Sequence, residues 1–417
     1  MKYGLIGEKL SHSFSPEIHK KIGDYPYALR ELTPDELNPF MTAKDFYAIN
    51  VTIPYKKAVI PYLDFISDEA REIGAVNTVV NKDGVLYGYN TDFEGLKSLV
   101  SRVTSGKDLS GKVLILGTGG TSLTANAVCR YLKADQIFTV SRSEKDGCIS
   151  YETAYEKHSD ASYIINCTPC GMYPKDSECP IDISRFPSLL GVVDAIYNPL
   201  RTVLIRNAKD KGIPAEGGLY MLVSQALIAY GHFFGITPDP ALTDRVYREI
   251  LSHKQNIVLI GMPSCGKSTV GKRICELLGR EFIDTDDMIV KKSGMPIPEI
   301  FKKYGEEHFR DLESEVIREI SSGVTGTVIS TGGGAVLRNE NVDLLRANGT
   351  LVFLDRDLDK LVPTQDRPLT SDLEALKQKY AVRYPIYDRV SDKKICGNGT
   401  VSEVAEAIIK YLKETSK

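Results

Sequence analysis

The sequence predicts an α/β protein with more than one domain, and three observations support this. Short β-branched runs at 46–51, 136–140 and 192–195 alternate with segments of helical spacing, a pattern typical of mainly parallel sheets covered by helices. The 417 residues are enough for two or three domains with full cores. Two glycine-rich loops of different type begin at residues 117 and 261, about one domain apart.

Composition excludes several classes of partner. The chain is 42% hydrophobic and 26% charged with a net charge of −3, so it gives no reason to expect nucleic acid or an anionic membrane as partner. No apolar run approaches the roughly 20 residues of a membrane span. The first seven residues read as a strand and a glycine turn, without the apolar core of a signal peptide. We therefore expect a cytoplasmic protein that acts on small molecules, of an oligomeric state that the sequence does not indicate.

The eight cysteines are scattered, as expected for free thiols in a reducing compartment. One pair, Cys167 and Cys170, has C-x-x-C spacing. No second Cys or His pair completes a zinc set. The pair also follows a strand-like run, 163–166, instead of opening a helix. We interpret it as a strand-to-loop turn beside a ligand site.

The second glycine-rich loop is a P-loop. Residues 261–268 match G-x-x-x-x-G-K-[ST], directly after the apolar run 257–260 and before a helical segment, 269–278. In such a loop the lysine, here Lys267, reaches the β- and γ-phosphates, and the hydroxyl of Ser268 binds Mg²⁺. The pattern predicts ATP and Mg²⁺ binding. The residues expected at the nucleotide are Ser264, Cys265, Gly266, Lys267, Ser268 and Thr269.

Further motifs follow the P-loop in a fixed order. Asp284 and Asp286 end a strand-like run, and alternate residues of a strand face the same side, so both carboxylates are expected to face the P-loop. Next come the motifs F-R at 309–310, G-G-G at 332–334, R-P-L at 367–369 and R-Y-P-x-Y at 383–387. The P-loop is shared by many families, whereas this ordered set is specific. Residues 256–417 resemble shikimate kinase, which implies an α/β fold like that of P-loop nucleoside-monophosphate kinases.

The resemblance implies a role for each motif. Arg310 and Arg383 would grip the substrate carboxylate, and Gly333 would let the backbone approach the ring. Asp286 would accept the proton of the attacking hydroxyl, and Asp284 would lie near Mg²⁺. Arg367, on a lid, would contact the nucleotide and stabilise charge on the transferred phosphoryl group.

The lid segment departs from the pattern of this family. Residues 361–367 form a short segment that lacks an expected upstream arginine, and Thr370 replaces an expected apolar residue. This departure bears on turnover and leaves the identity of the substrate unchanged.

The first glycine-rich loop indicates a dinucleotide. Gly117, Gly119 and Gly120 follow the apolar run 113–116 and precede a helical segment, 122–132, whose N-terminus can bind a pyrophosphate. The next strand-like run ends in Ser141-Arg142-Ser143. A basic residue between hydroxyls suits a 2′-phosphate, so the sequence predicts NADP(H) over NAD.

The segments around this loop carry a second resemblance. They are H-S-x-S-P at 12–16, N-V-T-x-P-x-K at 50–56, G-A-V-N-T at 74–78, N-T-D at 90–92, and later segments at 166–168, 194–199 and 218–225. As a group they resemble shikimate dehydrogenase over residues 1 to about 250. This implies a substrate lobe and a Rossmann-like NADP lobe.

The resemblance implies that Lys56 and Asp92 form the catalytic pair at the carbonyl being reduced. A positioned Lys–Asp pair can pass a proton to the developing alkoxide. The remaining implied contacts are Ser13 and Ser15 with the substrate carboxylate, Thr52, Asn77 and Gln225 with ring hydroxyls, Tyr197 near the ring, and Gly218 at the cofactor.

We expect three structural parts in the chain. Residues 1–98 and 220–252 would form the substrate lobe, 99–219 the NADP lobe, and 254–417 the kinase domain. The polar residues 252–256 mark the boundary between the two halves.

The two resemblances name consecutive reactions, so we expect a bifunctional enzyme of aromatic amino-acid precursor synthesis. Two alternatives remain open. The dehydrogenase could act on quinate, or the kinase on another polyol acid. One half could instead be an inactive ligand-sensing module, for which the short lid is the only support.

Overall fold

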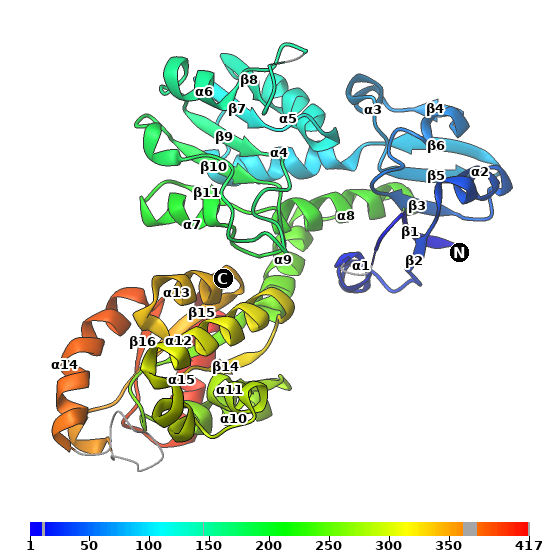
Figure 1. Cartoon of the computed structure of the whole chain (residues 1–417). Coiled ribbons are helices and arrows are strands. Elements are labelled where there is room, and N and C mark those ends of the chain that lie inside the picture. The colour runs from blue at the N-terminus through cyan, green and yellow to red at the C-terminus, as the bar shows by residue number, and fades with distance from the viewer. Residues whose placement is uncertain (11–12, 145, 362–372, 416–417) are drawn as a thin grey trace. The chain divides into compact units, whose positions relative to one another are not determined.

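The computed structural model describes residues 1–10, 13–144, 146–361 and 373–415. The chain divides into two compact units, residues 1–250 and 251–417. The colours in Figure 1 follow the chain from its blue N-terminus to its red C-terminus.

The first unit begins with a mixed sheet of six strands. Its order is β2-β1-β3-β5-β6-β4. Strand β5 runs antiparallel to both β3 and β6, whereas the other pairings in this sheet are parallel. The β5–β6 pairing follows from a tight hairpin in which Asp83 and Gly84 adopt φ values of 52° and 87°, as a two-residue Asp-Gly turn favours. The strands are β1 Tyr3–Gly7, β2 Ala28–Glu31, β3 Ala48–Val51, β4 Phe65–Ile66, β5 Thr78–Lys82 and β6 Val85–Tyr89.

Three helices accompany this sheet, and an apolar core lies against it. The helices are α1 Ser15–Ile22, α2 Pro34–Ala43 and α3 Asp68–Ile73. The core includes Met41, Phe46, Ile49 and Leu86, each at most 2% exposed. This lobe therefore has a hydrophobic core of its own, which fixes the strand ends that carry polar residues.

The second sheet of this unit has five parallel strands in the order β11-β10-β9-β7-β8. Its central strand residues are buried on both faces, as is usual for parallel sheets covered by helices. The strands are β7 Lys112–Leu116, β8 Gln136–Val140, β9 Tyr163–Asn166, β10 Gly191–Asp194 and β11 Ala215–Glu216; the helices are α5 Gly120–Tyr131, α6 Tyr151–Lys157 and α7 Val203–Asp210.

Two long helices pack closely together in this unit, α4 Thr91–Thr104 and α8 Leu219–Phe234. A Cβ atom at Gly95 would lie 2.9 Å from the carbonyl oxygen of Met221. Only a glycine therefore lets the two helices approach this closely, and the approach brings the start of α4 beside α8.

The second unit contains a five-stranded parallel sheet in the order β13-β14-β12-β15-β16. Parallel strands place their carboxyl ends at one edge, so the loops after β12, β13, β14 and β15 meet there. The strands are β12 Asn256–Ile260, β13 Phe282–Asp284, β14 Val328–Ser330, β15 Gly349–Asp355 and β16 Lys393–Cys396; the helices are α10 Lys267–Leu278, α11 Thr285–Ser293, α12 Ile297–Gly323, α13 Asn339–Asn348, α14 Leu373–Val390 and α15 Val401–Thr415.

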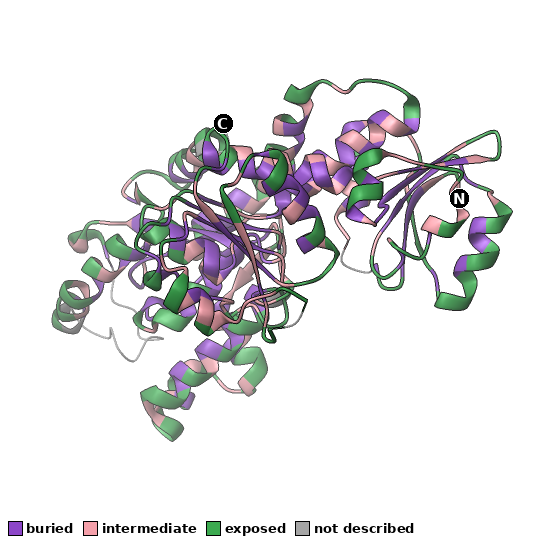
Figure 2. Ribbon diagram, turned by 90° about the horizontal axis from the view of Figure 1, so that it is seen from above, coloured by how far each residue is buried: buried purple, intermediate pink, exposed green. Residues whose placement is uncertain are grey.

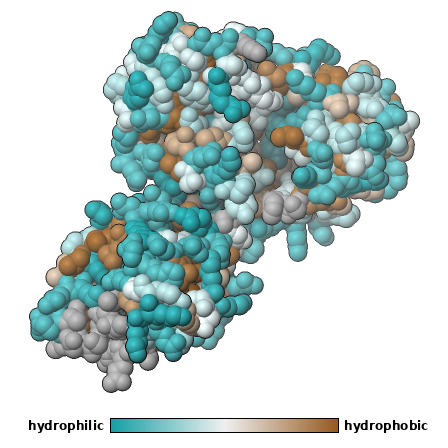
Figure 3. Space-filling model, in the orientation of Figure 1, coloured by the Kyte–Doolittle hydropathy of each residue, from teal (hydrophilic) through white to brown (hydrophobic). Residues whose placement is uncertain are grey.

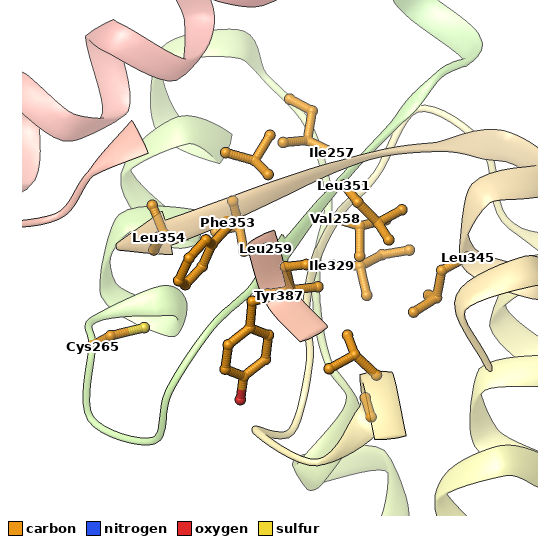
Figure 4. Packing of buried hydrophobic residues seen from close by; sticks show 14 of the residues in the cluster. Ile257, Val258, Leu259, Cys265, Ile329, Leu345, Leu351, Phe353, Leu354 and Tyr387 are labelled. Atoms are coloured by element: carbon orange, nitrogen blue, oxygen red, sulfur yellow. The ribbon is translucent and has the colours of Figure 1, made fainter. Parts of the chain in front are cut away.

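The core of this unit reaches from the sheet to the P-loop. Figure 4 shows Phe353 beside Tyr387, whose ring centroids lie 5.2 Å apart, and Cys265 of the P-loop among the same buried side chains.

In Figure 2 the buried residues follow the strands, whereas exposed residues cover the outer helix faces. Apolar residues form small separate patches on the surface shown in Figure 3.

The residues expected to link the two halves are partly helical. Helix α9, Pro240–Lys254, extends through residues 252–254, and β12 begins at Asn256. All eight cysteines are free thiols, including Cys167 and Cys170 in the loop after β9. None of the helices in the described ranges has both the length and the apolar character that crossing a membrane requires.

Candidate active sites

The first candidate site centres on Lys56 and Asp92. After β3 the chain makes a turn in which Tyr55 N–H donates to the carbonyl of Thr52 at 2.9 Å. The buried Tyr55 hydroxyl donates to the carbonyl of Leu32 and anchors this turn. Lys56 Nζ donates to Asp92 Oδ2 at 2.5 Å, with side chains 24% and 15% exposed. The ammonium group is therefore held in place and remains accessible.

The start of α4 positions Asp92. Asn90 is the N-cap of this helix, and its Oδ1 accepts from Phe93 N–H at 3.3 Å. Its Nδ2 donates to the carbonyl of Ala75 at 2.9 Å. Asp92 lies in the first turn, where the helix dipole favours a carboxylate. The N-T-D motif therefore supplies a helix cap together with the carboxylate that was predicted to be catalytic.

Asn77 and Gln225 are joined through Thr91. Thr91 N–H donates to Asn77 Oδ1 at 2.7 Å, and Thr91 Oγ1 accepts from Asn77 Nδ2 at 3.0 Å. The same hydroxyl donates to Gln225 Oε1 at 3.3 Å. Thr91 was not predicted as a site residue, although it stands in the middle of the N-T-D motif. It fixes which amide atoms of its two neighbours remain available to a ligand.

The predicted carboxylate-binding serines lie at the start of α1. Ser15 N–H donates to Ser13 Oγ at 3.3 Å. The intervening Phe14 ring lies 5.3 Å from the ring of Tyr197. Thr52 follows β3 directly and lies in the same turn as Lys56. Among the described residues no hydrogen bond joins the serines to Lys56 or Asp92.

The loop after β7 fits a pyrophosphate. Gly117 has a φ of 103°, and a Cβ atom there would lie 2.9 Å from Thr168 Cγ2. By contrast, a Cβ atom at Gly119 or Gly120 would meet no atom of the described residues within 4 Å. Gly119 is the N-cap of α5 and supplies no side-chain cap. The helix N-terminus therefore faces open space with N–H groups suited to phosphate oxygens.

The end of β8 fits a 2′-phosphate. Arg142 is exposed, and Ser143 N–H donates to Ser141 Oγ at 3.4 Å. The nearby Glu144 accepts from Ser150 N–H and the Thr153 hydroxyl, and these hydrogen bonds lower the pKa of its carboxyl group. The carboxylate of Glu144 is therefore already hydrogen-bonded to Ser150 and Thr153 of the same lobe.

Gly218 has a packing role in the structure. Its N–H donates to the carbonyl of Ile196 at 2.8 Å, and its own carbonyl accepts from Leu222 N–H at 2.9 Å. A Cβ atom at this position would clash with the carbonyl of Ala195. Both backbone groups of Gly218 are therefore used within the protein, and its missing side chain allows the turn to approach β10.

Asp194 is a buried carboxylate at the end of β10 that the sequence did not single out. It accepts hydrogen bonds from Asn166 Nδ2 at 3.0 Å, Ile196 N–H at 3.0 Å and the Thr202 hydroxyl at 2.7 Å. Burial raises the pKa of this carboxyl group to about 6, against the opposing effect of these donors. Asp194 thereby ties the end of β9 to the loop that carries Tyr197.

The second candidate site begins at the P-loop. Gly266 has a φ of 99° and is the N-cap of α10. Lys267 is 5% exposed, and its Nζ donates to the carbonyls of Gly261 and Met262 at 3.0 Å and 2.9 Å. Ser264 adopts a φ of 64° in the loop. The P-loop carbonyls thus hold the ammonium group of Lys267, which is the first residue of α10.

Ser268 and Asp284 form the oxygen pair expected near Mg²⁺. Ser268 Oγ donates to Asp284 Oδ2 at 2.7 Å. Both are hard oxygen ligands of the kind Mg²⁺ prefers. Within the described residues no group of three or more His, Cys, Asp or Glu side chains could hold a metal ion. A Mg²⁺ ion bound by this pair would take its other ligands from phosphates and water, as Mg²⁺ usually does.

The expectation that Asp284 and Asp286 alternate on one strand is wrong. Strand β13 ends at Asp284, and Asp286 lies in the first turn of α11. Asp284 is the N-cap of that helix, and its Oδ1 accepts from Asp286 N–H at 3.0 Å. Helix capping by Asp284 therefore outweighs continuation of the strand.

Asp286 nevertheless lies beside the other predicted substrate residues. A Cβ atom at Gly332 would lie 2.7 Å from Asp286 Oδ1 and 2.8 Å from Glu313 Oε1. A Cβ atom at Gly334 would clash with the guanidinium group of Arg310. The triple glycine therefore passes directly over these polar groups, as a backbone that approaches a ligand requires.

Gly333, the middle residue of the triple glycine, contacts both the P-loop and α14. A Cβ atom at Gly333 would lie 2.8 Å from Pro263 Cδ. The carbonyl of Gly333 accepts a hydrogen bond from the buried Tyr387 hydroxyl. Arg383, one turn before Tyr387 on α14, is 5% exposed. The R-Y-P-x-Y motif thus supplies both an inward arginine and the tyrosine that anchors the glycine loop.

Arg310 is held by two carboxylates. Its Nη1 donates to Glu313 Oε2 at 2.7 Å and its Nη2 to Glu306 Oε1 at 3.1 Å. Burial raises the pKa of the Glu313 carboxyl group, Asp286 adds to this, and Arg310 opposes it. Glu313 was not predicted, although its spacing of three residues from Arg310 on α12 places both on one helix face.

Lys379 is a third cation near Arg310 and Arg383, and it was not predicted from the sequence. Its pKa is lowered by burial and by the positive charges of Arg383 and Arg310. Lys379 stands four residues before Arg383 on α14, so the two side chains share a face. Three cations, Arg310, Arg383 and Lys379, therefore lie in one part of this unit, together with the carboxylates that pair with Arg310. Arg367 of the predicted lid lies outside the described residues.

Comparisons with known proteins agree for both halves. The family model described as shikimate dehydrogenase substrate binding domain matches residues 5–79, and that described as shikimate kinase matches residues 263–413. Shikimate dehydrogenase (NADP(+)) of Clostridium perfringens strain SM101 is 38% identical over 270 residues, covering 60% of this chain and 97% of the relative.

Two solved structures extend these comparisons. One is a chorismate mutase/shikimate 5-dehydrogenase fusion protein from Clostridium acetobutylicum, which is 36% identical with a TM-score of 0.56 and covers 60% of this chain and 96% of that one. The other is shikimate 5-dehydrogenase from Thermus thermophilus in complex with NADP(H) and shikimate, which is 28% identical with a TM-score of 0.53 and covers 60% and 99%. The chain therefore belongs to the shikimate dehydrogenase family over its first part and continues into a shikimate kinase domain.

Proposed function

We propose that this chain catalyses two consecutive reactions of the shikimate pathway. The first unit reduces 3-dehydroshikimate to shikimate with NADPH, and the second phosphorylates shikimate to shikimate 3-phosphate with ATP. The observation that carries the proposal is the presence of both sites in one chain, each with its own set of charged residues. The product of the first reaction is the substrate of the second, and the two assignments rest on separate residues.

In the first unit Lys56 and Asp92 carry out the proton chemistry. NADPH supplies the hydride when bound. Lys56 donates a proton to the oxygen that becomes negatively charged, and Asp92 holds the ammonium group in place. Ser13 and Ser15 bind the substrate carboxylate, while Asn77 and Gln225, oriented by Thr91, bind ring hydroxyls. The short Lys56–Asp92 hydrogen bond supports these roles.

In the second unit Asp286 is the group that accepts the proton of the substrate hydroxyl. ATP with Mg²⁺ supplies the phosphoryl group when bound. Arg310 and Arg383 hold the substrate carboxylate, as paired guanidinium groups do. Lys267 and the N–H groups of the P-loop neutralise phosphate charge. The nearness of Asp286 to the triple glycine supports this arrangement.

The test uses the purified full chain with 3-dehydroshikimate and NADPH, followed by addition of ATP and Mg²⁺. Loss of NADPH and then formation of ADP and shikimate 3-phosphate is expected. Quinate, offered with NADP or NAD, is a parallel substrate, and faster oxidation of quinate than of shikimate would contradict the substrate assignment. ADP formation that stays at background with shikimate would contradict the kinase assignment.

A further inference from the structure

Arg356 lies at the edge of the kinase sheet that carries the P-loop. It directly follows β15, which pairs with β12, the strand that leads into the P-loop. The turn that contains it is braced on both sides. Gly397 N–H donates to the carbonyl of Asp355 at 2.7 Å, and Asp357 N–H donates to Asn398 Oδ1 at 3.2 Å. The backbone of Arg356 is therefore fixed, and its side chain starts from a defined position.

The side chain of Arg356 reaches the last glycine of the P-loop. Its Nη1 lies 3.7 Å from the position that a Cβ atom of Gly266 would occupy. Its Cβ lies 3.4 Å from the equivalent position of Gly397. The residue thus stands between the P-loop and the turn after β16. The side chain is half-buried, so a ligand can approach it there.

Arg356 has a donor without an acceptor in this position. Its Nε is buried and makes no hydrogen bond with any residue that the structure describes. The two flanking carboxylates are engaged elsewhere, since Asp355 Oδ2 accepts from the Tyr384 hydroxyl at 3.1 Å and Asp357 Oδ2 accepts from Lys360 Nζ at 3.1 Å. A buried donor without a partner is unfavourable, and a guanidinium group with a structural role would normally fill its hydrogen bonds.

Phosphate oxygens are suitable acceptors for this guanidinium group, whose Nη1 lies beside Gly266 of the P-loop. Guanidinium groups bind phosphate through charge-assisted hydrogen bonds, and the N-terminus of α10, capped by Gly266, attracts the same ligand. We propose that Arg356 is a further nucleotide-binding residue, which binds the phosphate chain of ATP at the outer side of the P-loop. This inference rests on the proposed kinase function and adds to it a contact from the turn after β15.

The experiment compares three variants of the full chain. Arg356→Met keeps the aliphatic stem and removes the charge, whereas Arg356→Lys keeps the charge. Lys393→Ala is the matched control, because Lys393 is an exposed cation at the opposite end of β16. Kinase rates are measured with ATP varied at saturating shikimate, and with shikimate varied at saturating ATP. Binding of ADP and of inorganic tripolyphosphate is measured by calorimetry.

The expected result is a KM for ATP raised about tenfold in Arg356→Met, a smaller rise in Arg356→Lys and no change in Lys393→Ala. The KM for shikimate and the dehydrogenase rate stay unchanged. Tripolyphosphate and ADP both bind more weakly to Arg356→Met. An unchanged KM for ATP and unchanged ADP binding would overturn the proposal. Weaker binding of ADP alone would overturn the phosphate assignment, because the contact would then be with the nucleoside.

The kinase assignment and the role of Arg356 are tested separately. If the wild-type chain binds ADP but does not phosphorylate shikimate, the kinase assignment fails. The binding measurements on Arg356→Met still decide the role of Arg356 in that case. If the wild-type chain phosphorylates shikimate and Arg356→Met keeps the wild-type KM for ATP, only the role of Arg356 fails.

Discussion

Lys56 Nζ donates a hydrogen bond to Asp92 Oδ2 at 2.5 Å, although the two residues are 36 positions apart in the chain. One follows β3 and the other opens α4. The turn around Tyr55 and the cap at Asn90 fix the two side chains independently. The pair is therefore set before a substrate arrives, which reduces the reorganisation needed at the reacting oxygen.

Replacing Lys56 by Ala is expected to lower the dehydrogenase rate at least about 100-fold, since a positioned proton donor contributes this much or more. The kinase rate of the same protein should not change, which controls for the amount of intact chain. Lys57→Ala is the matched variant, because Lys57 is its exposed neighbour. A Lys56→Ala enzyme that retained the wild-type dehydrogenase rate would show that the proton comes from another group.

The glycines of the loop after β7 should separate cofactor binding from folding. Gly119→Ala places a methyl group in open space at a φ of −79°. We expect folding stability to stay within about 0.5 kcal/mol, as for surface changes, while the KM for NADPH rises because the methyl group enters the pyrophosphate space. Steady-state kinetics and a thermal melt of the variant measure the two effects.

Gly117→Ala is the contrasting change in that loop. Its φ of 103° and the 2.9 Å approach to Thr168 make any side chain strained there. The expected cost is on the order of 1–3 kcal/mol of stability. If Gly119→Ala were the more destabilising of the two, the open space at Gly119 would not represent a ligand site.

The sequence predicted the features that depend on local patterns. The P-loop, its strand and its helix are contiguous, so G-x-x-x-x-G-K-[ST] between an apolar run and a helical segment was sufficient. The loop at Gly117 was recognised in the same way. The antiparallel position of β5 was missed, although the Asp83-Gly84 turn is a hairpin signal.

Residues whose roles depend on distant partners were not predicted. Glu313 matters because the fold places it beside Asp286 and Arg310, and Asp194 because three donors from separate segments converge on it. Asp286 lies beside the triple glycine, but the argument that led to its prediction was incorrect, since a helix capped by Asp284 replaces the expected strand. Donors that converge from separate segments, as at Asp194, leave no local signature in a single sequence, whereas the spacing of Glu313 from Arg310 is a local signal that the prediction did not use.

The carboxyl group of Asp194 should make the stability of the first unit depend on pH. Its pKa is about 6 in the folded protein against 3.8 for an ordinary Asp. The folded state therefore binds the proton more tightly, so the stabilising contribution is full below about pH 4 and is lost as pH rises through about 6. Between about pH 4.5 and 7.5 the calculated loss is roughly 2 kcal/mol.

Hydrogen exchange of peptides from β9 and β10 can measure this in the full chain. Protection from exchange gives a free energy of opening for each protein. The difference in this free energy between the wild type and Asp194→Asn should shrink by roughly 2 kcal/mol as pH rises, because the side-chain amide of the variant does not titrate in this range. Comparing the two proteins at equal pH cancels the intrinsic exchange rates. A difference independent of pH would mean that Asp194 titrates at its ordinary value.

Glu313 should stabilise the kinase unit mainly by pairing with Arg310. Glu313→Ala leaves the guanidinium group of Arg310, whose side chain is 8% exposed, without its buried carboxylate. Removing one partner of a buried pair typically costs about 3–5 kcal/mol. The Glu313→Ala variant should therefore lower the melting temperature of this unit and raise the KM for shikimate, since Arg310 would no longer be held toward the substrate.

Glu306→Ala removes the other carboxylate of Arg310, which is 47% exposed. Because exposed pairs contribute about 1 kcal/mol or less, this variant is the control for a change of charge on the same arginine. Calorimetric melts and shikimate kinetics of both variants measure the contrast. Equal effects of the two substitutions would mean that charge alone, without burial, determines how Arg310 is held, and the role assigned to Glu313 would then be wrong.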